Sequence, residues 1–541
     1  MKKNKILFLL LFILLLPLFS FLHSGLPLTH DGQDHVARMA NFCASLKEGN
    51  LVPRWAANLN WGYGHPILMF LYPLPSFAAC FFNFLGFGLV EATKISFALS
   101  FLLSGWLMFL WAKESWGKKA GLAAALVYLF APYRFVDLYV RGAIGECWAF
   151  VWPPLILYFA LKLSRKFQYC YLIGGALAWA ALFLSHNALS LMFLPLIIVY
   201  LGYLVFTSPK KWRLAVGYLF LVATGFALSA FFWLPAFFEG KYTLRDIVTK
   251  GNITGFETFS RLIHSSWNYG GSGSFSVQLG IIQWLGIILS PWLIWQLKRK
   301  NNSCWIWYLF LFVYFWIGIF LILPFSRPLY LKISLLQKFQ FAWRWLSLAI
   351  FIPPLFWAGF TELLSSKKQK KLILGLTFAL PLLTFSYWQP KGYLLKPESF
   401  YTQAYPGTTD TGESAPRWSV RFMEKYPSAP IEVIDGKARV QQLSRQTTEH
   451  QFLVESETEA RLVDNTLYFP GWQVFADEQP VEIQFQDPNW RGLITFRVAP
   501  GAHRVKVIFR ETRLRRAANS VSGLAVLGLL FIPLMLKLKR Q

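Results

Sequence analysis

Long apolar runs, separated by short basic clusters, dominate the chain and set what it can fold into. The runs lie near residues 6–22, 90–112, 119–133, 146–163, 169–185, 188–206, 214–235, 278–297, 304–323, 340–361, 372–388 and 518–536. Most are close to the roughly 20 residues that a helix needs to cross a bilayer. With 55% hydrophobic and 15% charged residues, the 541-residue chain has too little polar surface for a soluble protein. The pattern therefore predicts an α-helical polytopic membrane protein.

The net charge of +26, from 53 basic against 27 acidic residues, raises the question of nucleic acid. The basic residues, however, form small clusters between the apolar runs, which is typical of cytoplasmic anchors under the positive-inside rule. The seven clusters are Lys2/Lys3/Lys5, Lys113/Lys118/Lys119, Arg165/Lys166, Lys210/Lys211/Arg213, Lys298/Arg299/Lys300, Lys367/Lys368/Lys370/Lys371 and Lys537/Lys539/Arg540. A nucleic-acid binder would instead gather its charge on one soluble face. We therefore expect membrane lipids as surroundings and no nucleic-acid partner.

The topology follows from keeping every basic cluster on one side. The opening run lacks a small-x-small cleavage pattern, so it indicates a signal anchor with the N-terminus inside. Residues 66–87 are apolar but contain three prolines, and counting them as a crossing would move later basic clusters outside. We predict that this segment is re-entrant or interfacial. About twelve crossings then remain, in the cytoplasmic (inner) membrane, with both termini cytoplasmic.

A second domain follows the main membrane part. Residues 389–517 hold sixteen of the 27 acidic residues and contain eight short alternating segments separated by turns such as Asp435-Gly436 and Pro500-Gly501. The segments are IEVI, ARVQQL, QFLVES, ARLVDN, WQVFA, VEIQF, LITFRV and HRVKVIF. This pattern predicts a β-sandwich. The number of predicted crossings before it places it on the extracytoplasmic side. It lies between a transmembrane domain at 1–388 and a final helix with a basic tail at 518–541.

The five cysteines show no CxxC pair, and none lies in the predicted sandwich. Neither a disulfide framework nor a zinc finger is implied by this spacing.

The acidic residues of the membrane part point to the outer side. Eleven remain outside the sandwich, and on the predicted topology only Glu114 and Glu362 lie inside. The other nine fall at outer helix ends or in the predicted outer loops 23–89, 134–146 and 236–277. Any acid–base or metal chemistry should therefore face outward.

The first outer loop carries the most suggestive spacing. Asp31, Asp34, His35 and Arg38 follow an i, i+3, i+4, i+7 pattern, which places them on one helix face. Such a face could activate a hydroxyl and hold a phosphate. The alternative is that Asp31 caps the helix, Asp34 complements its dipole and the rest is a solvated face.

The second outer loop adds Asp137, Arg141 and Glu146. Arg134 and Tyr139 in the same loop suit interfacial anchoring. Glu146 opens an apolar helix, where an acid beside lipid needs a partner, so we favour a functional role for it.

Three further features leave their alternatives open. His186, next to Asn187, is as consistent with a turn as with a ligand. Arg344 stands between Trp343 and Trp345, where it could either snorkel or bind a phosphate at headgroup depth. The run Gly270-Gly271-Ser272-Gly273 suggests a mobile flap, and Glu239 and His264 near it receive no role.

Taken in order, the motifs THDGQDHVAR, PRW, YGHPILMFLYPLP, APYRFVDLYVRGAIGE, FQFAWRWL, DNTLYFPGWQV and RGLITFRVAPGAHRVKVIF resemble a known set. The chain resembles the bacterial membrane family labelled "6-pyruvoyl-tetrahydropterin synthase-related", and it is similar to membrane proteins of lipoteichoic-acid glycosylation. Both look like GT-C glycosyltransferases. No soluble synthase domain and no set of zinc-spaced histidines supports the pterin label. The chain departs from the related pattern at Ala342, where proline would be expected before Trp-Arg.

The resemblance implies transfer of a sugar from a polyprenyl-phosphate donor to an extracytoplasmic glycan, lipid or protein acceptor. Asp31 matches the first-loop catalytic acid, and Glu146 or Asp137 the second-loop acid. In chemical terms Asp31 would act as base, with Asp34 and Glu146 as further catalytic carboxylates. The substrate and phosphate contacts would come from His35, Arg38, Asp137, Arg141, His186 and Arg344.

A divalent ion on Asp31, Asp34 or Glu146 is conceivable, with oxygen ligands suited to Mg²⁺ or Mn²⁺, and His35 leaves zinc open. A single displacement with a base predicts inversion at the anomeric carbon. No organic cofactor is expected.

Two other classes stay open. A lipid-linked sugar flippase would place ionisable groups near the bilayer midplane and often shows inverted repeats, whereas these acids cluster at one face. A non-catalytic scaffold for envelope glycan assembly would need far fewer spans than this chain has.

Overall fold

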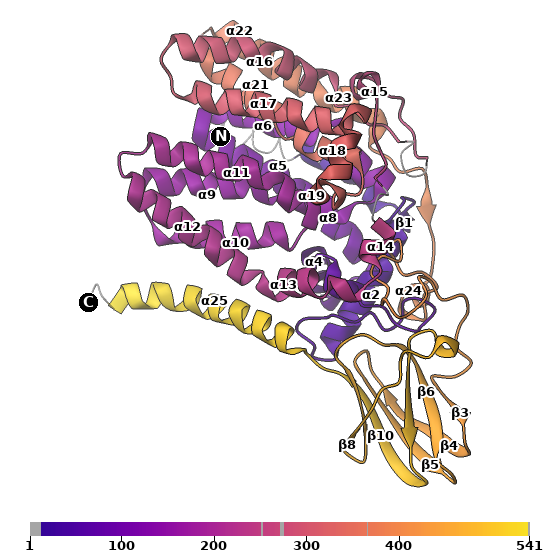
Figure 1. The fold of residues 1–541 in the computed structure, drawn as a ribbon. Helices are drawn as coiled ribbons and strands as arrows, with labels where there is room; N and C mark the ends of the chain where they lie inside the picture. Colours follow the sequence, from indigo (N-terminus) through magenta and orange to yellow (C-terminus); the bar gives the residue numbers. More distant parts are fainter. Residues whose placement is uncertain (1–11, 250–252, 271–274, 365, 539–541) are drawn as a thin grey trace.

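The computed structural model describes all residues except 1–11, 250–252, 271–274, 365 and 539–541. Figure 1 shows a body of helices, a β-sandwich that protrudes from one end of it, and a long C-terminal helix that returns from the sandwich along the body. Several predicted features lie outside the described residues. They are the first basic cluster, the start of the predicted signal anchor, and Lys539 and Arg540 of the last cluster.

Six helical segments among the described residues are long and apolar enough to cross a membrane. They are Leu89–Trp116 (α5), Ile144–Arg165 (α8 and α9), Asn187–Thr207 (α11), Lys211–Leu228 (α12), Cys304–Ile322 (α17) and Ala342–Leu363 (η5, α20 and α21). A seventh would be α6 (Lys118–Leu129) with Pro132–Arg141, which are bent by 54°. The prediction of about twelve crossings is not confirmed.

The count falls short because several apolar runs fold into short or interrupted helices. α10 (Tyr169–Phe183) has 15 residues, about 22 Å of helix against a hydrocarbon core of about 30 Å. α13 (Ala230–Phe238) is set off from α12, and the 372–388 run is split into α22 (Lys367–Phe378) and α23 (Leu380–Thr384). The remaining long helices are α16 (Ile281–Arg299) and α25 (Arg513–Leu538).

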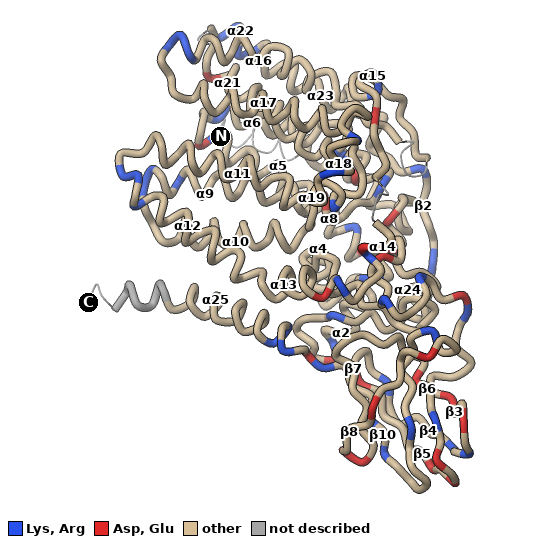
Figure 2. The backbone as a smooth tube through the Cα atoms, viewed as in Figure 1, with Lys and Arg blue, Asp and Glu red and all other residues tan. Residues whose placement is uncertain are grey.

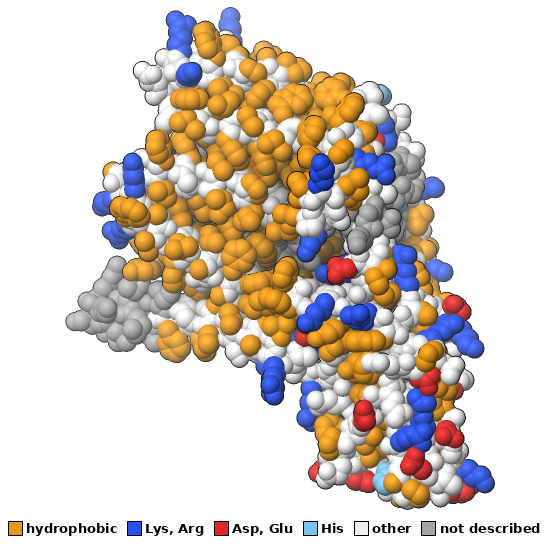
Figure 3. All heavy atoms as spheres, in the orientation of Figure 1, with side chains coloured by type: hydrophobic (Ala, Val, Ile, Leu, Met, Phe, Trp, Pro, Cys, Tyr) orange, Lys and Arg blue, Asp and Glu red, His pale blue; other side chains and the backbone are white. Residues whose placement is uncertain are grey.

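The surface of the helical body is that of a membrane protein. Hydrophobic side chains cover the face seen in Figure 3, and large ones such as Trp212 and Leu219 are 86% and 69% exposed. Figure 2 shows Lys and Arg gathered at the helix ends farthest from the sandwich, at the junctions near α9, α11, α12 and α22. Apolar surface of this extent is stable in lipid rather than in water.

The chain between the first apolar run and α5 forms a compact layer of short elements. η1 (Leu16–Leu22) leads to β1 (Leu26–Pro27), which pairs with β2 (Tyr393–Leu394), and α2 (Gly32–Lys47) follows. The segment predicted not to span contains only α3 (Ile67–Phe70) and α4 (Leu74–Phe84). An 11-residue helix covers about 16 Å, too short to cross.

Cys43 of α2 and Cys80 of α4 form a disulfide. The expectation of no disulfide was wrong, because the two residues are 37 positions apart and meet only through the packing of α2 on α4. Cys147, Cys170 and Cys304 are free.

Seven of the eight predicted strands are present, and one is displaced: the predicted segment VEIQF covers residues 481–485, whereas the strand observed there ends at Val481. The observed strands are β3 (Ile431–Asp435), β4 (Ala438–Arg445), β5 (Glu449–Ser456), β6 (Ala460–Leu467), β7 (Trp472–Ala476), β8 (Gln479–Val481), β9 (Leu493–Val498) and β10 (Gly501–Phe509). They form two antiparallel sheets, in the orders β4-β5-β10-β7-β8 and β3-β6-β9. Their inner faces enclose a core that includes Phe452, Leu462 and Val505. The strands begin at Ile431, so the preceding residues, with α24 (Ser399–Thr402), belong to the connection rather than to the sandwich.

The segment that leaves the sandwich is tied to the helical body by two ion pairs, one buried and one partly buried. Arg54 contacts Glu511 at 2.7 Å, and Arg515 contacts Glu239 at 2.7 Å. This gives Glu239, which had no role from sequence, a structural one. The pairs hold the base of α25 against the body beside α12 and α13.

Two predicted loops are partly helical. Residues 134–146 form α7 (Pro132–Phe135), the π-helical turn η2 (Val136–Arg141) and the start of α8 (Ile144–Ala149), and all of them are buried. Arg134 is 1% exposed and stacks 4.2 Å from the Phe150 ring, so the anchoring interpretation was wrong.

The 236–277 loop also contains short helices, η3 (Gly240–Tyr242), α14 (Arg245–Thr249) and α15 (Phe259–Ile263), and residues 271–274 of the predicted flap lie outside the described part.

The remaining short elements lie elsewhere in the chain. They are η4 (Pro324–Ser326), α18 (Arg327–Lys332), α19 (Ser334–Gln337), η6 (Phe385–Tyr387) and η7 (Pro488–Trp490).

Candidate active site at a buried arginine–carboxylate cluster

Glu146 is the centre of a buried polar cluster near the start of α8. Its Oε1 accepts hydrogen bonds from Arg141 at 2.8 Å and Arg344 at 3.2 Å. Its Oε2 accepts from the hydroxyls of Tyr133 at 3.1 Å and Ser347 at 3.0 Å. The side chain is 1% exposed. Four donors leave the carboxylate little capacity to take a proton from a substrate, so its geometry suits holding the two guanidinium groups.

The two arginines differ in what they leave available. Arg141 also donates to Asp137 at 2.7 Å and to Tyr133 at 3.0 Å, and its guanidinium lies 4.3 Å from the Trp343 ring. Arg344 donates its Nη1 to the Phe339 carbonyl at 2.8 Å, and its Nη2 has no hydrogen bond to a described residue. Arg344 therefore has a donor to offer a ligand. Arg141 makes more hydrogen bonds within the cluster, whereas Oδ2 of its partner Asp137 is buried and has no hydrogen bond to a described residue.

Arg344 does not snorkel. It is 8% exposed and forms part of the buried cluster, on the 3₁₀ turn η5 (Ala342–Trp345). At Ala342, where the related pattern has proline, the backbone N–H donates to the Thr254 carbonyl at 3.0 Å. A proline could not make this bond, so alanine changes how the turn is anchored but leaves Arg344 in place.

The start of α2 docks directly onto the second segment. The backbone N–H groups of His30 and Asp31 donate to the carbonyls of Val140 and Arg141, each at 2.9 Å. Gly142 follows in the left-handed region at φ +67°, and a Cβ there would lie 2.3 Å from Thr29 Oγ1. This contact brings the predicted acidic face of α2 next to the Glu146 cluster.

Asp31 occupies the N-cap position of α2, but its side chain makes no capping hydrogen bond. The hydroxyl of Thr29 accepts from Gly32 N at 3.1 Å instead. Asp31 is half-buried, and its carboxylate has no hydrogen bond to a described residue. The capping interpretation therefore does not account for this side chain, which is free to act on a ligand.

The other residues of the α2 face are more constrained. Asp34 accepts from the Tyr405 hydroxyl at 2.7 Å, and burial raises its pKa while the charge of Arg38 opposes the rise. His35 is 4% exposed and bonds to the Gly142 backbone, and burial together with the Arg38 charge holds its pKa well below the usual range. Arg38 donates its Nε to the Asp34 carbonyl at 3.3 Å, and its two Nη groups have no hydrogen bond to a described residue.

Tyr72 was missed from sequence, although it stands in the YPLP turn. Its ring packs on Gly145, where an added Cβ would lie 2.1 Å from the ring, and stacks on His186 at 4.9 Å. Burial raises the pKa of Tyr72 to about 12. The nearby charges of Arg38, Asp31, Glu146 and Arg344 also influence this pKa. One side chain thus lies among groups from three separate parts of the chain.

His186 is the N-cap of α11, and its Nδ1 accepts from Leu189 N at 3.2 Å. His186 therefore makes the turn, and its ring stacks on Tyr72, while a role as a ligand stays a prediction.

The metal prediction finds no ligand set here. Among the residues that the structure describes, no three His, Cys, Asp or Glu side chains are grouped so that they could hold a metal ion. The Glu146 oxygens are already used by four donors. A requirement for Mg²⁺, Mn²⁺ or zinc stays a prediction, and we derive no chemical step from it.

No family model matches the chain, so the pterin-synthase-related label stays a resemblance. A protein of Lactococcus lactis subsp. cremoris (strain MG1363), described only as uncharacterized, is 27% identical over 237 residues. The match covers 42% of this chain and 38% of that protein.

Three solved structures show weak likeness. ArnT from Cupriavidus metallidurans, in the apo state and bound to undecaprenyl phosphate, has a TM-score of 0.42 and 16% identity, over 74% of this chain and 68% of that one. The arabinofuranosyltransferase AftD from Mycobacteria has a TM-score of 0.42 and 15% identity, over 73% of this chain and 28% of that one. Likeness at this level does not assign a function.

Proposed function

We propose that the chain is a membrane glycosyltransferase that moves a sugar from a polyprenyl-phosphate donor to an extracytoplasmic acceptor. The observation that carries the proposal is that Asp31, an unbonded half-buried carboxylate, and the spare donors of Arg38 and Arg344 all lie within electrostatic reach of Tyr72. A base beside two cations suits attack by a hydroxyl on a carbon whose leaving group is a phosphate.

A cavity of about 460 Å³ beside the cluster supports a lipid-phosphate donor. Its lining is largely apolar, with Leu191, Phe226 and Trp233, and it also includes three cations and one acid, Lys241, Arg245, Lys338 and Asp246. Asn187 of the cavity follows His186, and Lys338 precedes Phe339, the acceptor for Arg344. A largely apolar cavity with a net positive charge suits a prenyl chain that carries a phosphate.

The chemistry follows from these roles. Asp31 takes the proton of the acceptor hydroxyl, whose oxygen forms a bond to the anomeric carbon. The bond from that carbon to the phosphate oxygen breaks, and the phosphate leaves with the electron pair. Arg38 and Arg344 offset the charge that develops on it. A single displacement inverts the anomeric carbon.

The proposed orientation places the site and the sandwich on the extracytoplasmic side of the cytoplasmic membrane, with both termini inside. Two observations support it: Lys and Arg gather at the opposite helix ends in Figure 2, and the Cys43–Cys80 disulfide lies in the layer beside the site. Disulfides persist in oxidising compartments.

Native mass spectrometry of gently solubilised protein tests the donor assignment. Wild type and Asp31→Asn should both retain a polyprenyl-phosphate sugar, and Arg344→Ala should retain much less of it. Arg213→Ala is the matched control, because Arg213 lies in the first turn of α12, 4.6 Å from the Phe167 ring, and has no contact with the cluster among the described residues. Only bulk phospholipid, unchanged in all four proteins, would contradict the proposal and favour a scaffold.

A further inference from the structure

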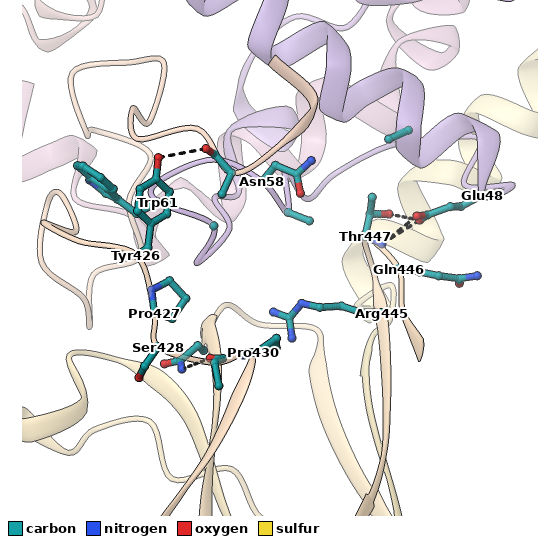
Figure 4. Close-up of a pocket in the computed structure, with 16 residues that line it drawn as sticks. Glu48, Asn58, Trp61, Tyr426, Pro427, Ser428, Pro430, Arg445, Gln446 and Thr447 are labelled. Carbon is teal, nitrogen blue, oxygen red and sulfur yellow. Dashed lines mark hydrogen bonds between the residues drawn. The ribbon is translucent and has the colours of Figure 1, made fainter. Parts of the chain in front are cut away.

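A cleft of about 470 Å³ separates the helical body from the sandwich, at a distance from the cluster. Figure 4 shows the side chains that line it: Glu48 from the end of α2, Asn58 and Trp61 from the following loop, Tyr426, and Arg445 and Gln446 from the β4–β5 turn. Ala44, also in its wall, comes thirteen positions after Asp31 on the same helical stretch. That spacing corresponds to about 20 Å along the helix.

The two aromatic side chains form a corner in the cleft wall. The rings of Trp61 and Tyr426 lie 4.7 Å apart at 78° to each other. Tyr426 is 51% exposed, and the Trp61 indole N–H has no hydrogen bond to a described residue. Flat apolar faces with polar edges, open to the cleft, are suited to a ligand that is apolar on its faces and hydroxylated at its rim.

Trp61 is held in this position by unusual backbone. Asn60 and Trp61 both have positive φ, +55° and +62°, which is rare for a bulky residue and costs of order 1 kcal/mol each. Their N–H groups donate to the carbonyls of Gly407 and Tyr405, each at 2.9 Å. The Asn60 side chain accepts from Met423 N at 2.9 Å. Contacts from both sides thus fix a conformation that presents the indole.

The two charged side chains that line the cleft are both hydrogen-bonded to other groups of the protein. Both Glu48 oxygens accept from Thr447 N, at 3.1 and 2.9 Å, and Oε2 also accepts from the Thr447 hydroxyl. Arg445 lies 3.5 Å from Asp464 and donates to Thr466 at 3.0 Å. The exposed amide of Gln446 remains to offer both a donor and an acceptor. The site therefore favours a neutral, hydroxyl-rich ligand over an anionic one.

We propose that this cleft binds a neutral oligosaccharide chain, as a secondary site formed jointly by the helical body and the sandwich. Its volume falls in the range of ordinary ligand sites. The part of the proposal that makes this chain the distal end of the acceptor rests on the glycosyltransferase function above. In that arrangement the cleft would hold a growing glycan about 20 Å from Asp31.

The test is a binding titration on the full-length protein in a zwitterionic detergent without a sugar headgroup. Neutral hexasaccharides of glucose, galactose and mannose are the probes, with a sulfated hexasaccharide as the anionic comparison, and isothermal titration calorimetry is the readout, since it does not depend on Trp61. At least one neutral probe should bind, and Trp61→Ala and Tyr426→Ala should each weaken that binding at least tenfold. Trp490→Ala is the matched control, because Trp490 is also a half-buried tryptophan but does not line the cleft.

Tyr426 is exposed, so its variant keeps the test valid if Trp61→Ala misfolds. Binding of no neutral probe, or binding that survives both cleft substitutions, would overturn the inference, as would tighter binding of the sulfated probe. Asp31→Asn should bind the neutral probe as wild type does. If wild type transfers sugar and Asp31→Asn does not, but no protein binds the probes in the cleft, only this inference fails. If the probes bind in the cleft but wild type transfers no sugar, only the proposed function fails.

Discussion

Glu146→Gln is the substitution whose effect the structure defines best. Glu146 is 1% exposed and faces Arg141 and Arg344, whose side chains are 7% and 10% exposed. Glutamine keeps the shape but removes the charge that compensates two buried guanidinium groups. Removing one partner of a buried ion pair typically costs about 3–5 kcal/mol.

Glu114→Gln is the matched control. Glu114 also contacts two cations, Lys162 at 3.4 Å and Arg165 at 2.6 Å, but its side chain is 27% exposed and that of Arg165 is 49% exposed. Exposed pairs contribute less than about 1 kcal/mol. The predicted order of stability is therefore wild type, then Glu114→Gln, then Glu146→Gln well below both.

The assay is thermal unfolding of the purified proteins in one detergent, followed by intrinsic fluorescence. The double variant Glu146→Gln/Arg344→Gln should recover part of the loss, since it removes one of the uncompensated charges. Equal unfolding temperatures for Glu146→Gln and Glu114→Gln would refute the reasoning, because Glu146 would then not hold the two arginines together.

Three further predictions follow from the same geometry. Gly142→Ala should unfold at a lower temperature than Gly49→Ala. Both glycines have positive φ, +67° and +91°, but only at Gly142 would a Cβ lie within 4 Å of another group. Equal unfolding temperatures would contradict the docking of α2. Because the pKa of His35 is held below its ordinary 6.5, its contribution to stability is present above pH 6.5 and is lost as the pH falls below it. The unfolding temperature should drop on acidification, and His35→Gln should flatten that drop. Alkylation of the denatured protein without reductant should tag three cysteines, and after reduction five, whereas five tags in both would exclude the Cys43–Cys80 disulfide.

Features with a local pattern could be predicted from the sequence. The alternation of apolar and polar residues located seven of the eight strands, because strand burial repeats every two residues, and it placed the remaining one, β8, too late in the chain. The helical spacing of Asp31, Asp34, His35 and Arg38 placed them at one helix start, and the structure brings that start against Arg141. Three prolines in the 66–87 segment indicated a re-entrant or interfacial segment rather than a span, and the structure has only the short helices α3 and α4 there.

Features that depend on contacts between distant residues could not be predicted from the sequence. Charged residues at 134–146 suggested a loop, since an isolated charge at membrane depth is costly, but Asp137, Arg141 and Glu146 compensate one another and allow the segment to be buried. Hydropathy alone did not show that runs such as α10 are too short to cross. The disulfide, the position of Tyr72 and the contact of Asp34 with Tyr405 join residues 37 or more positions apart, for which spacing carries no signal.

The most direct test of the central claim is single-turnover transfer with purified protein, a polyprenyl-phosphate sugar extract and a membrane acceptor fraction. Wild type should release polyprenyl phosphate and form a glycoside with an inverted anomeric carbon. Asp31→Asn should lose at least a hundredfold in rate while still binding the donor, whereas Asp435→Asn, a substitution at an exposed carboxylate of the sandwich, should react as wild type does. Unchanged transfer by Asp31→Asn, or retention at the anomeric carbon, would contradict the account.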